Sequence, residues 1–243
     1  MNARPLAGRR VAVLRASGEH DGIRGALEQC GAEAVTAIVA EVLDRSDAEV
    51  RHDVGDLARF EWVAVSSQHA ARRLALWAHT WPGSVRVGAV GPATAAAVER
   101  LGVRVALVAD AGTARSLAAR LDEGPILFLA ASSARDDLAR DLSARGIVVV
   151  TVVAYDLAPR ALAGADAEAL ASSDAIVAMS PAAIDALAAL PVASRDAALQ
   201  VPVVAIGPTT AEHAAVIGWP IRVVAGARDA TAVCEAVRVL FER

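Results

Sequence analysis

Two stretches decide the fold, because they show that the chain consists of two similar halves: AVGPATAAAVERLG at residues 89–102 and AIGPTTAEHAAVIG at residues 205–218. Each stretch begins with apolar residues, continues with Gly-Pro-x-Thr and an alanine-rich segment, and ends in glycine. Proline fits the first turn of a helix, where an N–H group would stay unpaired in any case, and glycine fits the position just past a helix end. Each stretch therefore predicts a strand, a tight turn and a helix.

Two further pairs of segments repeat in the same order. Residues 10–31 (RVAVLRASGEHDGIRGALEQCG) match 125–146 (PILFLAASSARDDLARDLSARG), and residues 62–75 (WVAVSSQHAARRLA) match 175–188 (AIVAMSPAAIDALA). Matching glycines and serines lie 113 to 116 positions apart. This spacing indicates a tandem duplication of a unit of about 115 residues, which is too long for a solenoid repeat.

The repeated units predict an α/β fold with parallel sheets. Their apolar runs lack the alternation of a half-exposed strand, as expected of parallel strands buried on both faces. Strand, turn and helix in succession also favour right-handed crossover connections. The expected strands are 11–14, 34–39, 63–65, 87–90, 126–129, 147–155, 176–179 and 203–206. The helices behind four of these strands are expected to end at Gly31, Gly102, Gly146 and Gly218.

Two polar passages at equivalent places in the repeats are candidate linkers. Residues 41–46 follow one expected strand and residues 156–164 follow its counterpart. If both are linkers, the chain crosses between two domains twice, and the N-terminal block completes the sheet of the C-terminal segment. The expected organisation is a discontinuous domain of 1–39 plus 160–243, a continuous domain of 44–154, and linkers at about 40–43 and 155–159.

The composition excludes several classes of protein. All 24 basic residues are arginines, so the chain cannot carry a P-loop lysine, a Schiff-base lysine or the ATP-binding lysine of a kinase. The net charge of −4 gives no basic field for nucleic acid. With 55% hydrophobic residues the chain can bury a core, yet its longest apolar runs fall far short of the ~20 residues that span a bilayer.

Cysteine and histidine usage argues against a disulfide framework and against a metal site. The chain has two cysteines, and its five histidines are scattered without ligand spacing. The N-terminal sequence MNARPLAGRR contains no apolar signal region. We therefore expect a cytoplasmic protein that uses no metal and no membrane. We also expect it to be a monomer.

Hydroxyl side chains gather where the expected strands end. Each Gly-Pro-x-Thr turn places hydroxyls beside the free N–H groups and positive end of a helix, a site that favours carboxylates or phosphates. Serines follow other strands, at the edge where open α/β sheets bind ligands. The alternative is that all of them only cap helices, but the occurrence of two equivalent copies favours a ligand site. The candidates are Ser66, Ser67, Thr94, Ser180, Thr209 and Thr210.

Three further residues are candidates for the same site. Arg15 and Arg135 occupy equivalent turn regions after strands and could contact acidic ligand groups, although exposed surface arginine is the alternative. Tyr155, the only tyrosine, ends a strand at the start of a linker. A lone tyrosine is more often a core residue than a catalyst, but its place where two domains would face each other brings the two alternatives level. Ser67 and His69 do not indicate a hydrolase, because residues two apart on a helix face different directions and the Gly-x-Ser-x-Gly motif is missing.

Taken together, these segments resemble the uroporphyrinogen-III synthase family. The motifs that carry the resemblance are AVGPAT, AIGPTT, VSSQHA, MSPAAI and the stretch ARDDLARDLSARG followed by VVAY, and the likeness runs over residues 11–240. It implies two flavodoxin-like domains joined by a two-stranded connector. It also implies an enzyme that cyclises linear hydroxymethylbilane in the cleft between the domains, with loss of water and inversion of ring D, and that needs no cofactor.

The resemblance also assigns roles to residues. The family's substrate-contacting hydroxyls correspond to Ser67, Thr94, Ser180, Thr209 and Thr210, and the tyrosine proposed to assist departure of the hydroxyl corresponds to Tyr155. Porphobilinogen deaminase is the expected upstream supplier of substrate. Helix N-termini and arginines suit the eight carboxylates of this substrate. Because the azafulvene formed on water loss is reactive, the protein mainly has to hold one geometry, with weak acid assistance.

The chain departs from common residues of the family at a few positions, namely Ala16, Gln68, Ala130 and Ala131. The alternative function is therefore a non-catalytic, two-lobed protein that binds a tetrapyrrole or another small molecule.

Overall fold

The structure, a computed structural model, describes residues 4–17, 22–110, 112–134, 136–162 and 164–242. The chain divides into two compact units: unit 1 comprises Met1–Glu41 and Ala158–Arg243, and unit 2 comprises Val42–Leu157. The chain passes from one unit to the other in two strands, β2 (Glu33–Asp44) and β7 (Val149–Pro159).

Unit 1 contains a parallel sheet with the strand order β10-β9-β8-β1-β2. Its strands besides β2 are β1 (Arg10–Ala16), β8 (Ala175–Ala178), β9 (Val203–Ala205) and β10 (Val223–Val224). Its helices are α1 (Gly22–Gln29), α7 (Ala165–Ala171), α8 (Pro181–Ala188), α9 (Val192–Leu199), α10 (Pro208–Ile217) and α11 (Ala230–Phe241).

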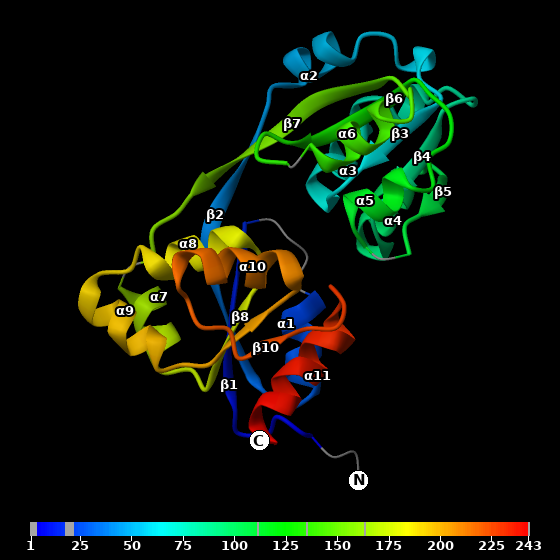
Figure 1. The fold of residues 1–243 in the computed structure, drawn as a ribbon. Coiled ribbons are helices and arrows are strands. Elements are labelled where there is room, and N and C mark those ends of the chain that lie inside the picture. Colours follow the sequence, from blue (N-terminus) through cyan, green and yellow to red (C-terminus); the bar gives the residue numbers. More distant parts are fainter. Residues whose placement is uncertain (1–3, 18–21, 111, 135, 163, 243) are drawn as a thin grey trace. The chain divides into compact units, whose positions relative to one another are not determined.

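Both faces of this sheet are buried. Val11 and Val13 of β1 pack in one core cluster with residues of α1 and α11, which lie side by side in Figure 1. Ala12 and Leu14, which alternate with these valines, pack in the core cluster on the other face of the sheet with residues of α7, α8 and α10. Successive side chains of a strand point to opposite faces, so the continuous apolar run of β1 serves helices on both sides.

Unit 2 repeats this architecture with the strand order β7-β6-β3-β4-β5, and these neighbours are also parallel. Its remaining strands are β3 (Trp62–Val65), β4 (Arg86–Ala89), β5 (Val105–Val108) and β6 (Ile126–Ala131). Its α-helices are α2 (Asp47–Val54), α3 (Gln68–Arg73), α4 (Pro92–Glu99), α5 (Ala114–Ala118) and α6 (Asp137–Ser143). Short 3-10 helices occupy Leu57–Arg59, Leu74–Leu76 and Ala78–Thr80.

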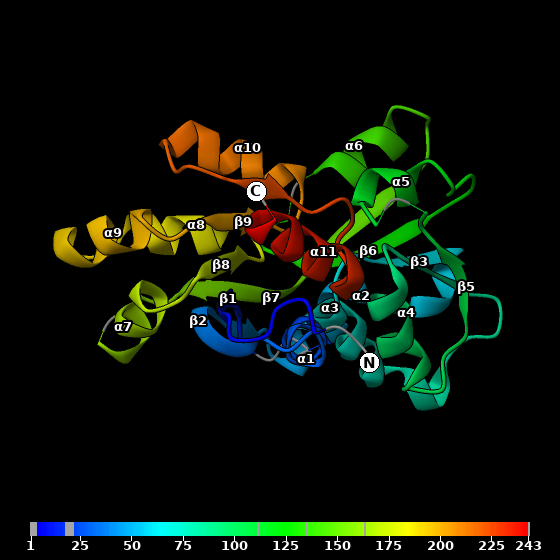
Figure 2. The same ribbon diagram turned by 90° about the horizontal axis from the view of Figure 1, so that it is seen from below.

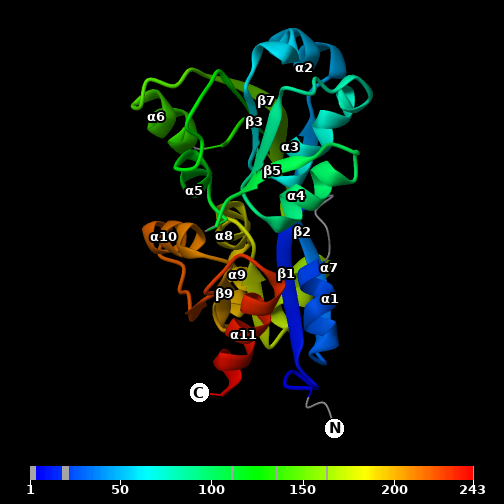
Figure 3. The ribbon, with the colours of Figure 1, turned by 90° about the vertical axis from the view of Figure 1, so that its right-hand side faces the viewer.

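The helices of unit 2 also cover both faces of their sheet. Val63 and Val65 of β3 share a core cluster with residues of α3 and α4, which contact each other (Figure 3). Trp62 and Ala64 pack in the other cluster with α5 and α6, a second pair of neighbouring helices (Figure 2). The α/β class with parallel strands, as predicted from the repeated strand–turn–helix pattern, is confirmed.

The two strands that pass between the units form an antiparallel ladder. Within unit 1 the N–H group of Arg160 donates to the carbonyl oxygen of Val39 at 2.8 Å. Within unit 2 the N–H group of Arg45 donates to the carbonyl oxygen of Ala154 at 3.2 Å. From the first hydrogen bond to the second, the residue number rises on the β2 side while it falls on the β7 side, as expected of antiparallel strands. Residues 40–43 and 155–159, expected as linkers, therefore lie in strands.

Glycine ends several helices as the sequence predicted. Gly102, Gly146 and Gly218 have φ of +77° and Gly31 has φ of +97°, a left-handed conformation that residues with a Cβ adopt at a cost. Among the described residues, no helix combines the length and apolarity needed to cross a membrane.

Candidate active site

The candidate site of unit 2 begins at the carboxyl ends of three neighbouring strands. Val65 of β3 pairs with Ala89 of β4 on one side and with Leu129 of β6 on the other, so these strands end nearly level. The turn with Ser66 and Ser67 and the Gly-Pro-x-Thr turn therefore leave the sheet at the same edge. This is the edge where open parallel sheets bind ligands.

Ser67 and Tyr155 are brought together by the fold. The hydroxyl of Tyr155, on β7, donates to Oγ of Ser67 at 2.9 Å. Ser67 is the N-cap of α3, and its Oγ also accepts the N–H group of Ala70 at 3.0 Å. Tyr155 is only 6% exposed and belongs to the core cluster of unit 2, whereas Ser67 is half-buried. The serine thus caps a helix and at the same time binds the buried phenol.

His69 completes this group, although no sequence motif assigns it a role. Its imidazole is 8% exposed, and its ring lies 5.4 Å from that of Tyr155 between centroids, with a tilt of 49°. Nε2 is buried, and no described residue forms a hydrogen bond with it. Burial lowers the pKa of His69, as does the positive charge of Arg72, while Asp44 partly opposes the shift. The imidazole is therefore favoured in its neutral form.

The first Gly-Pro-x-Thr turn opens α4, with proline in the first helical turn as predicted. Thr94, the third residue of α4, is 6% exposed, so it lies inside the helix rather than at the N-cap, which is Gly91. Gly91 has an extended backbone with φ of −174°, and a Cβ added there would meet no described atom within 4 Å. Neither backbone conformation nor local packing therefore requires glycine here, and the backbone stays open to a ligand.

Unit 1 has the corresponding arrangement at the ends of its own strands. Ala178 of β8 pairs with Leu14 of β1 and with Ala205 of β9, so the turns that follow start from one edge. Ser180 is the N-cap residue of α8, but its side chain forms no capping hydrogen bond. The capping alternative therefore holds for Ser67 and fails for Ser180.

The second Gly-Pro-x-Thr turn opens α10, which packs against α8. Thr210 is 2% exposed and Thr209 is half-buried, and both lie in the first turn of the helix. One turn further on, Nε2 of His213 lies 2.6 Å from a carboxylate oxygen of Asp185 on α8. This pair joins the two helices whose N-terminal ends hold the candidate hydroxyls of unit 1.

The predicted arginines have different outcomes. Arg15 was expected in the turn after a strand, but it lies within β1 and pairs with Ile38 of β2. The strand extends past the apolar run because its backbone still finds a partner in β2. The predicted position of Arg15 was therefore wrong, and its contact with an acidic ligand group stays a prediction. Arg135 lies outside the described residues. Ser66 precedes Ser67 at the strand edge and is half-buried.

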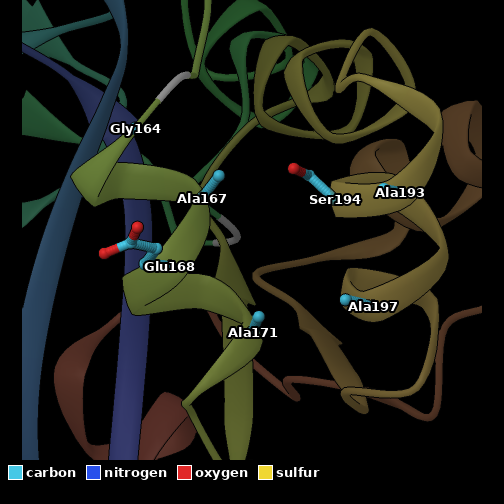
Figure 4. Close-up of a pocket in the computed structure, with 7 residues that line it drawn as sticks. All are labelled: Gly164, Ala167, Glu168, Ala171, Ala193, Ser194 and Ala197. Carbon is cyan, nitrogen blue, oxygen red and sulfur yellow. The ribbon is translucent and has the colours of Figure 1, made fainter.

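Two further features lie outside the candidate residues. In the part of the chain that the structure describes, no three His, Cys, Asp or Glu side chains form a group that could hold a metal ion. A cavity of about 340 Å³ lies between α7 and α9, and no candidate residue lines it (Figure 4). Its lining residues are Gly164, Ala167, Glu168, Ala171, Ala193, Ser194 and Ala197.

Comparison with known proteins gives one family and several similar folds. The family model of uroporphyrinogen-III synthase HemD matches residues 21–234. A search of curated proteins finds no significant match.

Two solved structures share the fold. The chain is 19% identical to a mutant uroporphyrinogen III synthase from the extremely thermophilic bacterium Thermus thermophilus, with a TM-score of 0.62, and the likeness covers 97% of this chain and 100% of that one. It is 18% identical to the uroporphyrinogen-III synthetase of Helicobacter pylori, with a TM-score of 0.63 and coverage of 96% and 100%.

Proposed function

Because the chain belongs to the uroporphyrinogen-III synthase family, a family of lyases, we propose that it converts linear hydroxymethylbilane into uroporphyrinogen III with inversion of ring D and loss of water. The observation that carries this proposal is the family match, which spans residues 21–234 and so covers all of unit 2 and most of unit 1. The match favours the enzyme over the non-catalytic binding protein that Ala16, Gln68, Ala130 and Ala131 left open.

We further propose that the two units are flavodoxin-like domains that arose by duplication and exchanged their first two strands. The order β2-β1-β8-β9-β10 in unit 1 and the order β7-β6-β3-β4-β5 in unit 2 correspond strand for strand. Both orders follow the 2-1-3-4-5 pattern of flavodoxin-like sheets. In this proposal each unit takes two strands from one repeat and three from the other.

The substrate fits the proposed site residues by charge. Eight carboxylates need hydrogen-bond donors and positive potential, which helix N-termini supply without lysine. We assign substrate binding to the strand edges of both units and departure of the hydroxyl to Tyr155. The proposed binding residues are Ser66, Ser67, Thr94, Ser180, Thr209, Thr210, Arg15 and Arg135. Porphobilinogen deaminase is the proposed supplier of hydroxymethylbilane, and a cytoplasmic monomer without cofactor is the proposed form of the enzyme.

A coupled assay tests this function. Porphobilinogen deaminase generates hydroxymethylbilane in the presence of the purified chain, and the products are oxidised to porphyrins and separated into type I and type III isomers. We expect type III to dominate, in the presence of a chelator as well as without one. If only the type I isomer that forms spontaneously is found, the chain is not a synthase. Binding of the bilane without type III product would support the non-catalytic alternative.

A further inference from the structure

The hydrogen-bonding capacity of Ser67 is almost fully used within unit 2. A serine hydroxyl can accept two hydrogen bonds and donate one. The hydroxyl of Tyr155 donates to Oγ of Ser67 at 2.9 Å, and the N–H group of Ala70 donates to the same atom at 3.0 Å. Both acceptor positions are therefore occupied, and the remaining capacity of Ser67 is its own O–H group as a donor.

Burial places the serine in front of the phenol. Tyr155 is 6% exposed, with its ring packed in the core cluster and against His69, whereas Ser67 is half-buried at the strand edge. Ser67 is therefore the more exposed of the two residues towards a ligand at this edge. The phenol is thus aligned to give its proton to the serine rather than to the substrate.

Building on the proposed function, we propose that Ser67 gives the proton to the departing hydroxyl of the bilane and that Tyr155 replaces this proton in the same step. The bond between the hydroxymethyl carbon and its oxygen breaks, and the oxygen leaves as water with the proton of Ser67. The serine oxygen takes the phenolic proton, so Tyr155 becomes a phenolate and the substrate a cation. When the macrocycle closes, the substrate loses a carbon-bound proton, which returns through Ser67 to Tyr155.

This arrangement gives the two residues distinct roles. Ser67 is a catalytic residue because it contacts the reacting oxygen, and its neutral hydroxyl is a poor acid by itself. Tyr155 makes the transfer possible, because a phenol with an ordinary pKa of about 10 is protonated at neutral pH and is a far stronger acid than an alcohol. His69 is a positioning residue, because its ring packs against the ring of this phenol.

A double-mutant cycle tests the proposal in the coupled assay. If two residues pass one proton in a relay, removing either residue abolishes the contribution of the whole relay to kcat, and removing the second residue costs nothing more. We therefore expect Ser67→Ala and Tyr155→Phe each to lower kcat about 10²-fold, and the double variant to lower it by about the same factor rather than by about 10⁴.

Three further variants of unit 2 separate catalysis from folding. Ser67→Asn keeps a good helix cap and an acceptor for the phenol but cannot give up a proton, so we expect it to fold and to lose about 10²-fold in kcat. Ser67→Thr keeps the hydroxyl and should stay within about threefold of the wild type. Ser46 caps α2 through the N–H group of Glu49 and is not a candidate site residue, so Ser46→Ala matches the loss of a cap and should leave kcat unchanged.

The outcomes are distinct. Multiplying losses in the double variant, or a wild-type kcat in Ser67→Asn beside a defective Tyr155→Phe, would overturn the relay and make Tyr155 the direct donor. If the wild-type chain itself forms no type III isomer, the proposed function fails instead. Equal losses in Ser67→Asn, Tyr155→Phe and the double variant support the relay.

Discussion

Replacing His69 with phenylalanine should change how the stability of the protein depends on pH. The wild-type imidazole is 8% exposed, its Nε2 has no hydrogen-bond partner among the described residues, and burial lowers its pKa from 6.5. The folded state therefore binds fewer protons at His69 than the unfolded state does. The stability that the protein has with a neutral His69 is fully present above pH 6.5. It is lost as the pH falls from 6.5 towards the lowered pKa of His69 in the folded state.

The size of the effect follows from the unfolded imidazole. At about pH 5.5 an unfolded histidine is protonated about 10:1, so a folded imidazole that stays neutral loses up to about 1.4 kcal/mol relative to about pH 7.5. Arg72 adds to this loss by its positive charge, and Asp44 reduces it. Phenylalanine does not titrate, and its packing contribution is the same at both pH values. When the pH is lowered from about 7.5 to about 5.5, the free energy of unfolding of His69→Phe should thus increase relative to that of the wild type by up to about 1.4 kcal/mol.

Urea unfolding at the two pH values measures this shift directly. Tyr155→Phe is the matched control, because it alters the same cluster but leaves the imidazole in place, and it should keep the pH dependence of the wild type. Equal stability differences between His69→Phe and the wild type at both pH values would show that the fold does not hold His69 neutral.

Three further predictions concern other positions. Ser67→Ala should destabilise the protein by about 1 kcal/mol in urea unfolding, because the serine caps α3. Ser180 makes no capping bond, so Ser180→Ala should change stability by less than about 0.5 kcal/mol. Equal losses in the two variants would contradict this difference in capping. Gly91→Ala should fold normally, since its Cβ meets no described atom within 4 Å, yet raise KM about tenfold by blocking the approach of substrate; an unchanged KM would exclude a ligand at this turn. Burial, reinforced by the nearby Cys30 thiol, raises the pKa of Cys234 to about 12, so iodoacetamide should alkylate Cys234 slowly at neutral pH and faster as the pH rises, as peptide mass spectrometry can follow; rapid alkylation at neutral pH would contradict this.

Local sequence signals located most of the elements. The apolar runs identified the buried strands because a strand covered by helices on both faces needs no polar positions. Gly102, Gly146 and Gly218 marked helix ends because a left-handed residue without a Cβ costs little there. The local signals failed where backbone pairing extended a strand, as for Arg15, which pairs with Ile38 although the apolar run has already ended.

The internal repeat and the short turn motifs thus determined the α/β class and the strand edges where Ser67, Thr94, Ser180 and Thr209 lie, because these features depend on neighbours within a few positions. Only the tertiary structure joined Tyr155 to Ser67, which lies 88 positions away in the sequence, and placed the ring of His69 against the phenol. No periodic pattern records such a contact, since it depends on β7 lying beside β6 and on α3 following β3 in the same unit. The buried phenol is consequently a property of the packed sheet, whereas the serine in front of it is already marked by its place at the start of a helix.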